Sequence, residues 1–183
     1  MIAVLFVQPS GVYSRVAGVD IWGPKRDARL YSGTCSVVAH PPCQRWGRYF
    51  QGGPSHPGLH TLGDDGGCFV SALASVRRYG GVLEHPKDSK AWDAHGLLRP
   101  PSAGGWIQAD AYGLTCCVDQ GHYGHRARKP TWLYTVGVGE VPLEWGRSGA
   151  QHPVEKMGRH ERARTPLPFR DLLIEMARAA RIS

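Results

Sequence analysis

Short apolar runs that alternate with one helical pattern constrain the fold of this chain more than any other feature. Residues 2–7, Ser36–Ala39 and Gly81–Glu84 are typical of buried strands, and Asp65–Tyr79 carries apolar residues at helical spacing. Strands alternating with helix and loop segments predict an α/β fold, here a small, loop-rich Rossmann-like sheet flanked by few helices. We expect one domain over residues 1–183, with functional residues at the carboxyl ends of strands.

The rest of the chain predicts short elements joined by long loops. Asp64 or Asp65 is expected to cap the helix, and Gly80-Gly81 to end it. Gly, Pro, His and aromatic residues in segment 44–64 predict a long loop beside the site, and segment 139–164 predicts irregular chain. Further strands are expected at 19–22, 113–120 and 131–138, and further helical segments at 26–31, 90–94 and 169–180.

Charge and cysteine content narrow the class of protein. A net charge of +7 over 183 residues favours a polyanionic partner, with nucleic acid (DNA above all) first and phosphorylated metabolites second. The five cysteines are odd in number and lack framework spacing, which favours a reducing cytoplasm over a disulfide scaffold. Neither a secretory signal nor a membrane span is predicted. The small basic chain suits a phage or mobile-element gene.

A cysteine follows one predicted strand on a stiffened turn, in His40-Pro41-Pro42-Cys43-Gln44. The prolines fix φ and remove two backbone donors, so the turn is expected to present Cys43 as a nucleophile. The alternative is a small buried side chain without chemistry. Glu84, at the end of the next strand, and the basic run 126–129 complete a set. A thiol, a carboxyl and a cation are the groups needed to add a thiolate to a pyrimidine ring.

Three segments in order resemble motifs of the DNA cytosine-5 methyltransferases. The family's Pro-Cys-Gln loop matches residues 42–44, and its Glu-Asn-Val strand end, about forty residues on, corresponds to Val82–Pro86. Its Tyr-Gly turn before a Gln-x-Arg-x-Arg strand corresponds to Tyr123-Gly124 before segment 127–131, although that strand here reads Ala127-x-Lys129-x-Thr131. The resemblance covers roughly residues 36–138 and implies a compact methyltransferase-like fold.

The resemblance also implies a mechanism. Cys43 would add as a thiolate to carbon 6 of the base, which makes carbon 5 nucleophilic. Glu84 would hydrogen-bond or protonate ring nitrogen 3, and Arg128 or Lys129 would hold the base carbonyl or a nearby phosphate. The target base would be flipped from a duplex or lie in a single strand.

A methyl donor, S-adenosylmethionine, is the cofactor that the resemblance implies. The residues that would hold it are Phe6, Gly11, Asp20 and Pro41. The family's Phe-x-Gly-x-Gly loop is represented here by a loop with one glycine, Gly11. Two alternatives therefore stay open: a nucleic-acid-binding relative that has lost the cofactor site, and an enzyme that modifies free pyrimidine nucleotides.

Basic and aromatic residues follow the candidate nucleophile. Such a loop suits stacking on bases and binding phosphates, and it equally suits packing under a long loop. The expected nucleic-acid contacts are Gln44, Arg45, Trp46, Arg48 and Arg126. No metal site is predicted: the histidine pairs lack a second Cys-x-x-Cys, and the cysteine pattern of a zinc deaminase is incomplete after Cys43.

Overall fold

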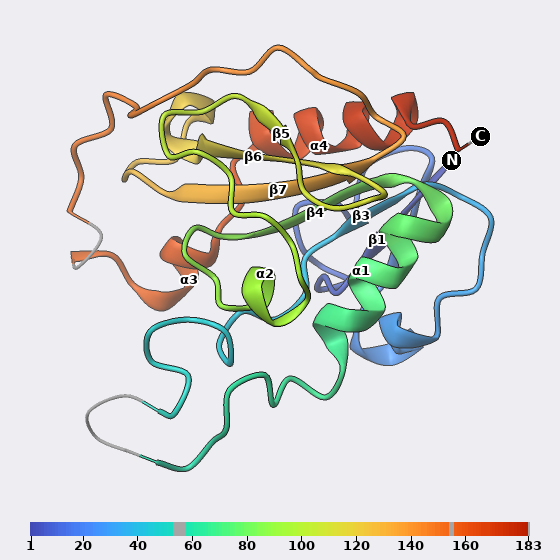
Figure 1. Ribbon diagram of the computed structural model, residues 1–183, viewed down its shortest axis with the longest axis horizontal. Helices are drawn as coiled ribbons and strands as arrows, with labels where there is room; N and C mark the ends of the chain where they lie inside the picture. Colours follow the sequence, from blue (N-terminus) through green and yellow to red (C-terminus); the bar gives the residue numbers. More distant parts are fainter. Residues whose placement is uncertain (53–57, 154–155, 183) are drawn as a thin grey trace.

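The computed structural model describes residues 1–52, 58–153 and 156–182, and its strands form one mixed sheet of seven (Figure 1). The order across the sheet is β2-β1-β3-β4-β7-β6-β5. The first four run parallel, whereas β7, β6 and β5 are each antiparallel to the strand before them in this order. The strands are β1 (Ile2–Leu5), β2 (Val19–Trp22), β3 (Val37–Ala39), β4 (Gly81–Pro86), β5 (Trp106–Gln108), β6 (Leu114–Asp119) and β7 (Pro130–Val136).

Helices cover both faces of this sheet. The longest two are α1 (Cys68–Tyr79), which packs on β3 and β4 from one face, and α4 (Leu167–Ala179), which packs on β1, β3 and β4 from the other (Figure 1). The shorter helical segments are α2 (Ala91–Ala94), α3 (Arg159–Ala163), η1 (Pro24–Arg26), η2 (Ala28–Leu30) and η3 (Gln120–Tyr123). Among the described residues, none of the helices has both the length and the apolar character needed to cross a membrane.

Two apolar clusters explain why the central strands are continuous apolar runs. Alternate residues of a strand point to opposite faces of the sheet. Thus Leu5 and Leu83 join the cluster under α1, while Val4 and Val82 join the cluster under α4. A strand that is covered on both faces has no solvent-facing side, so β1 and β3 consist of apolar residues alone and β4 opens with Gly81-Val82-Leu83.

The ends of α1 show how local sequence sets an element. Asp65 Oδ1 accepts hydrogen bonds from the backbone N–H groups of Gly67 and Cys68, and its Oδ2 accepts one from Phe69 N–H. These bonds satisfy donors that have no partner in the first turn of a helix. At the other end Gly80 adopts φ 74°, a conformation that favours glycine.

The prediction of an α/β fold with a small sheet and few helices is confirmed. The predicted stop of α1 at Gly80 is also found. The N-cap residue is Gly67, and the predicted Asp65, two residues earlier, supplies the carboxylate that accepts from the first N–H groups of the helix. The first strand is shorter than predicted, because Phe6 has φ 63° and turns the chain away from the sheet.

Three short elements were not predicted. They are β5, η3, which follows directly on a predicted strand, and α3, which lies in a segment predicted to be irregular. Segment 44–64, predicted as a long loop, contains neither helix nor strand in its described parts, and residues 53–57 lie outside the description.

The topology brings several chain segments to one edge of the sheet, which we call the carboxyl edge. Strands β3, β4 and β6 all end there, and β7 begins there because it runs antiparallel to both neighbours. The register places Ala39 beside Leu83, Pro86 beside Thr131, and Asp119 beside Pro130. Residues that follow β3 and β6, or precede β7, are therefore neighbours in space.

Candidate functional site at the carboxyl edge

Cys43, Glu84 and Lys129 come together at the carboxyl edge. Cys43 lies on the turn after β3, Glu84 is the fourth residue of β4, and Lys129 directly precedes β7. Burial and the negative charge of Glu84 raise the pKa of the Cys43 thiol, and the charge of Lys129 opposes this rise. Each of the three groups thus lies within electrostatic range of the other two.

The Glu84 carboxylate is held by donors from three segments. Its Oε2 lies 3.0 Å from His40 Nδ1, and its Oε1 accepts a hydrogen bond from Gln120 Nε2 at 3.2 Å. The other imidazole nitrogen, His40 Nε2, lies 2.8 Å from the Tyr13 hydroxyl. These contacts follow from the register: His40 comes directly after β3, and Glu84 is one residue beyond the partner of Ala39.

Strand alternation also explains why Glu84 and His85 lie in different surroundings. Glu84 points to the α4 side of the sheet, whereas His85 packs among Phe69 and Trp92 on the α1 side. His85 is 1% exposed, and its Nδ1 lies 2.7 Å from Ser89 Oγ. Burial lowers the pKa of His85 to about 4, so this imidazole is neutral and belongs to the core.

The pKa values of Glu84 and Lys129 are shifted by burial and by each other. Burial on its own would raise the pKa of Glu84, but the hydrogen bond and charge of His40, with the charge of Lys129, outweigh burial and lower it. Burial lowers the pKa of Lys129, and the charges of Glu84 and Cys43 oppose that change. The site therefore contains an ionised carboxylate, a protonated thiol and a lysine that gives up its proton more readily than usual.

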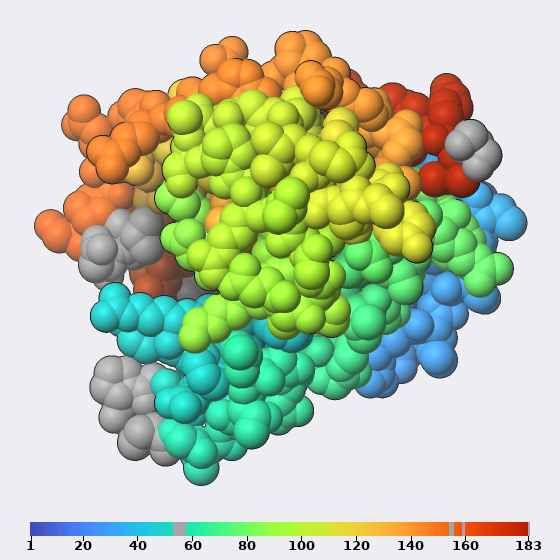
Figure 2. Space-filling view, in the orientation of Figure 1, coloured from blue at the N-terminus to red at the C-terminus, as the bar shows by residue number. Residues whose placement is uncertain are grey.

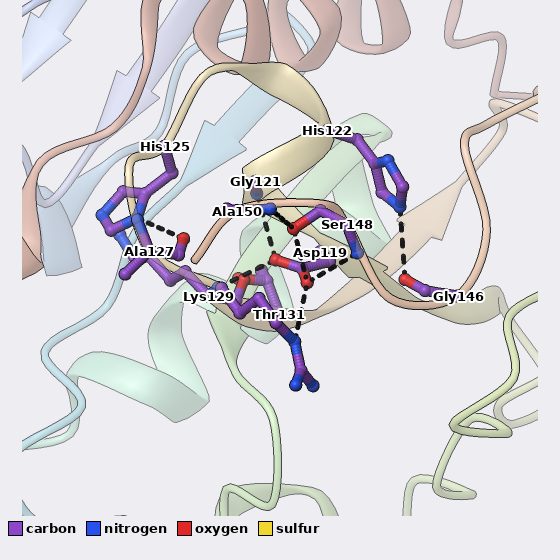
Figure 3. Close-up of polar contacts among 11 residues, drawn as sticks. Asp119, Gly121, His122, His125, Ala127, Lys129, Thr131, Gly146, Ser148 and Ala150 are labelled. Atoms are coloured by element: carbon purple, nitrogen blue, oxygen red, sulfur yellow. Dashed lines mark hydrogen bonds and ion pairs between the residues drawn. The ribbon is translucent and has the colours of Figure 1, made fainter. Parts of the chain in front are cut away.

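Asp119 fixes the backbone that carries Lys129 (Figure 3). Its Oδ1 accepts hydrogen bonds from the backbone N–H groups of Lys129 at 2.8 Å and Gly121 at 3.0 Å. Its Oδ2 accepts from both the N–H and the hydroxyl of Ser148. Burial would raise the pKa of this carboxyl, but these hydrogen bonds outweigh burial and lower it. Asp119 is thus a positioning residue that ties the end of β6 to the start of β7.

Lys129, and not Arg128, is the cation of the site. Arg128 Nε lies 3.6 Å from Asp119 Oδ2, and its side chain is 40% exposed. The Lys129 ammonium donates to the carbonyl oxygen of Arg164 at 3.1 Å. Among the described residues this carbonyl is the acceptor that the ammonium has, and an ammonium carries three N–H groups, so two remain for other acceptors.

A cavity of about 260 Å³ has Arg164, whose carbonyl accepts from Lys129, in its wall, but Cys43, Glu84 and Lys129 do not line it. The wall includes Arg126, Glu161 and the start of α4 at Pro166. Arg126, one of the predicted nucleic-acid contacts, is exposed and pairs with Glu161 at 2.7 Å. This cavity therefore combines cations with one carboxylate.

The predicted nucleic-acid loop needs one correction. Trp46 is 6% exposed, packs against Phe69 and donates its indole N–H to Asp65, so its ring belongs to the core and does not stack on bases. Gln44 and Arg48 are exposed, and Arg45 is half-buried with a hydrogen bond to the Phe50 carbonyl. In Figure 2 residues 43–52 (cyan) form one edge of the visible face, where Tyr49 is exposed.

The residues expected to hold S-adenosylmethionine do not form a cradle for it. Phe6 and Pro41 follow the neighbouring strands β1 and β3, but Gly11 lies in segment 6–18, whose residues are all described and contain no helix. The helix N-terminus that would face an anionic ligand is therefore missing from this segment. The Asp20 carboxylate, expected to hold a ribose, accepts from Trp22 Nε1 and pairs with Arg26. The residues present do not fit the cofactor.

Four residues of this site were not predicted: Tyr13, His40 as a partner of Glu84, Asp119 and Gln120. A signal existed for His40, because it continues the alternation of β3 and lies next to Glu84 once the two strands are placed side by side. Tyr13 and Gln120 give no such signal, since their roles depend on contacts between distant segments.

Within the parts of the chain that the structure describes, no three His, Cys, Asp or Glu side chains are grouped so that they could hold a metal ion. All five cysteines lie in those parts and are free thiols. Comparison of the chain with models of known families, with curated proteins and with solved structures gave no match.

Proposed function

We propose that this protein binds a pyrimidine base of a nucleic acid and adds the Cys43 thiolate to carbon 6 of the ring. The convergence of Cys43, Glu84 and Lys129 at the carboxyl edge carries the proposal. Thiol, carboxylate and ammonium are the groups that this addition needs. Burial raises the pKa of the Cys43 thiol and lowers that of Lys129, so these two pKa values move toward each other.

The chemistry needs no further reactant. A bond forms between Cys43 Sγ and carbon 6, the π pair of the C5–C6 bond shifts toward the group on carbon 4, and the thiol proton ends on carbon 5. The thiol proton travels to carbon 5 through water, and the charge of the Lys129 ammonium, which acts on Cys43, stabilises the thiolate and negative charge on a ring oxygen. Glu84 holds the ring at nitrogen 3. Reversal returns the base with its hydrogen at carbon 5 exchanged for one from water.

Methyl transfer from S-adenosylmethionine is not part of this proposal, because Asp20 and the loop after β1 do not fit that cofactor. The net charge of +7 supports a nucleic acid, DNA in the first place, as the partner. Exposed Arg48 and Tyr49, and the cavity wall with Arg126, are suited to the phosphates and bases that flank the target. The free thiols support a reducing, cytoplasmic environment.

A base-binding protein that forms no adduct is the second candidate. One observation favours it: burial raises the pKa of the Cys43 thiol, so the thiol is protonated at neutral pH. A protonated thiol is a poor nucleophile.

Hydrogen exchange at carbon 5 separates the two candidates. The purified protein is incubated in D₂O with a single-stranded oligonucleotide that contains uracil and cytosine, and mass spectrometry follows deuterium at carbon 5. Exchange that Cys43→Ser abolishes and Cys35→Ser preserves is the expected result, because Cys35 is a half-buried free thiol outside this site. Binding without exchange would favour the second candidate, and absence of both would overturn the two candidates together.

A further inference from the structure

The donors around Glu84 are fixed in direction. The Thr131 hydroxyl donates to the Lys129 carbonyl at 3.1 Å, so the Thr131 oxygen is the acceptor for Gln120 Nε2 at 2.9 Å. The amide nitrogen of Gln120, which is fully buried, therefore also faces Glu84 Oε1. Tyr13 holds the far side of the His40 ring and so directs Nδ1 at Glu84 Oε2.

A carboxylate whose two oxygens each accept a hydrogen bond from the protein is ionised, so it can accept a hydrogen bond from a ligand but has none to donate. Each oxygen has a second lone pair, which stays free for a further N–H group. The two donors and the nearby ammonium all favour the ionised form of Glu84. A ligand that needs a hydrogen from this carboxyl would first have to protonate it against these partners.

Pyrimidines differ at the ring edge that Glu84 meets. Nitrogen 3 of uracil carries a hydrogen, whereas nitrogen 3 of cytosine has a lone pair that the ionised carboxylate repels. Uracil also has a keto oxygen on each side of this nitrogen, and Lys129 has two N–H groups beyond the one given to Arg164. On uracil the N3–H group thus meets the acceptor Glu84, and one of the two keto oxygens meets an N–H group of Lys129.

Building on the function proposed above, we propose that the site formed by Cys43, Glu84 and Lys129 prefers a 4-keto pyrimidine, a uracil-type base, over cytosine. When Cys43 adds to uracil, the negative charge develops on the oxygen of carbon 4, and nitrogen 3 already carries the hydrogen that Glu84 accepts. Nitrogen 3 of cytosine lacks this hydrogen, so a proton must first bind between it and Glu84. A site built to pair one hydrogen-bonding pattern rejects a ligand that presents the opposite one.

Two oligonucleotides that differ in one base test the preference. Each consists of thymine apart from a single uracil or a single cytosine, so that only the target base has a hydrogen at carbon 5. We expect deuterium exchange into the uracil to be at least about 10-fold faster at pH 8, the fold-change typical of one mismatched hydrogen bond. Equal or faster exchange into the cytosine would overturn the preference and leave the proposed function intact. No Cys43-dependent exchange in either would overturn the proposed function and the preference with it.

A variant of the donor set tests the cause. His40→Leu removes one of the two donors that keep Glu84 ionised, and we expect the ratio of uracil to cytosine exchange to fall several-fold while total exchange also falls. If His40→Leu does not fold, Gln120→Met removes the other donor with little change in volume. An unchanged ratio in a folded variant, judged by circular dichroism, would show that the donors around Glu84 do not set the preference.

Discussion

The polar residues at the two ends of the sheet differ in exposure and in the distance along the sequence to their partners. At the β1–β2 end, the carboxylate of Asp20 and the guanidinium of Arg26 form an ion pair whose side chains are 38% and 49% exposed. At the β4–β7–β6 end, Asp119 is buried, the Glu84 side chain is 13% exposed, and both accept hydrogen bonds from segments far apart in the sequence. The first pair is local, whereas the second set links four segments.

This difference separates a surface contact from a built site. An exposed ion pair contributes about 0–1 kcal/mol to the free energy of unfolding, so either side chain can exchange its partner at little cost. Buried carboxylates are costly unless they are fully hydrogen-bonded, so their presence at the carboxyl edge requires either many partners or a function. The partners of Asp119 account for its burial structurally, whereas the donors around Glu84 also underlie the base preference that we propose.

The largest effect on stability is expected for Asp119→Ala. This substitution leaves the N–H groups of Gly121, Lys129 and Ser148 without their acceptor, and it should lower the free energy of unfolding by about 3 kcal/mol. Denaturant unfolding measures the loss. The matched substitution Asp20→Ala should cost less than about 1 kcal/mol. Similar losses for the two variants would contradict the comparison.

The next largest effect is expected on activity, with little change in the free energy of unfolding. Lys129→Met removes the ammonium whose charge acts on Glu84 and Cys43, and we expect exchange at carbon 5 to fall about 100-fold. Because burial disfavours the charged lysine, the free energy of unfolding should stay within about 1 kcal/mol of the parent or rise. Arg128→Met, which changes the neighbouring exposed cation, is the control and should keep most of the exchange. An equal loss of exchange in both variants would show that Lys129 is not the cation on which the reaction depends.

A pH effect follows from His85. Its pKa is about 4 in the folded protein and near 6.5 when unfolded, so the unfolded chain binds the proton first as pH falls. Stability is complete above pH 6.5 and is lost as pH falls toward 4, by about 2 kcal/mol between pH 7 and pH 5.

Replacement by a residue that does not titrate isolates this contribution. In His85→Gln the difference in unfolding free energy between pH 7 and pH 5 should shrink by about 2 kcal/mol relative to the parent. An unchanged difference would mean that another group causes the acid sensitivity.

The sequence predicted the central strands well because both of their faces are buried, which leaves an unbroken apolar run that needs no tertiary information. It could not predict β5 or α3, which are three and five residues long and depend on neighbouring segments. The end of β1 was misplaced because the left-handed conformation of Phe6 has no signature in a non-glycine residue.

The candidate site was predicted only in part, for a related reason. Cys43, Glu84 and Lys129 each follow or precede an apolar run, so their positions at strand ends were visible in the sequence. The partners Tyr13, Gln120 and Asp119 depend on strand order and register, which one sequence does not specify. Trp46 was assigned to the surface because an aromatic residue in a basic loop has the same pattern whether it packs or binds.

The smallest effect is expected at the β1–β2 end, on adding S-adenosylmethionine. Asp20 already has two partners in Trp22 and Arg26, and the segment after β1 offers no helix N-terminus, so calorimetric titration with millimolar ligand should give no heat. Arg26→Ala frees one side of Asp20 and makes the test stricter: if the ion pair alone blocks the ligand, this variant will bind it. Heat with the parent protein would show that the exposed pair yields to a ribose, and would restore methyl transfer as the outcome of thiolate addition at the other end of the sheet. No heat with either protein would leave the addition proposed at the β4–β7–β6 end independent of this cofactor.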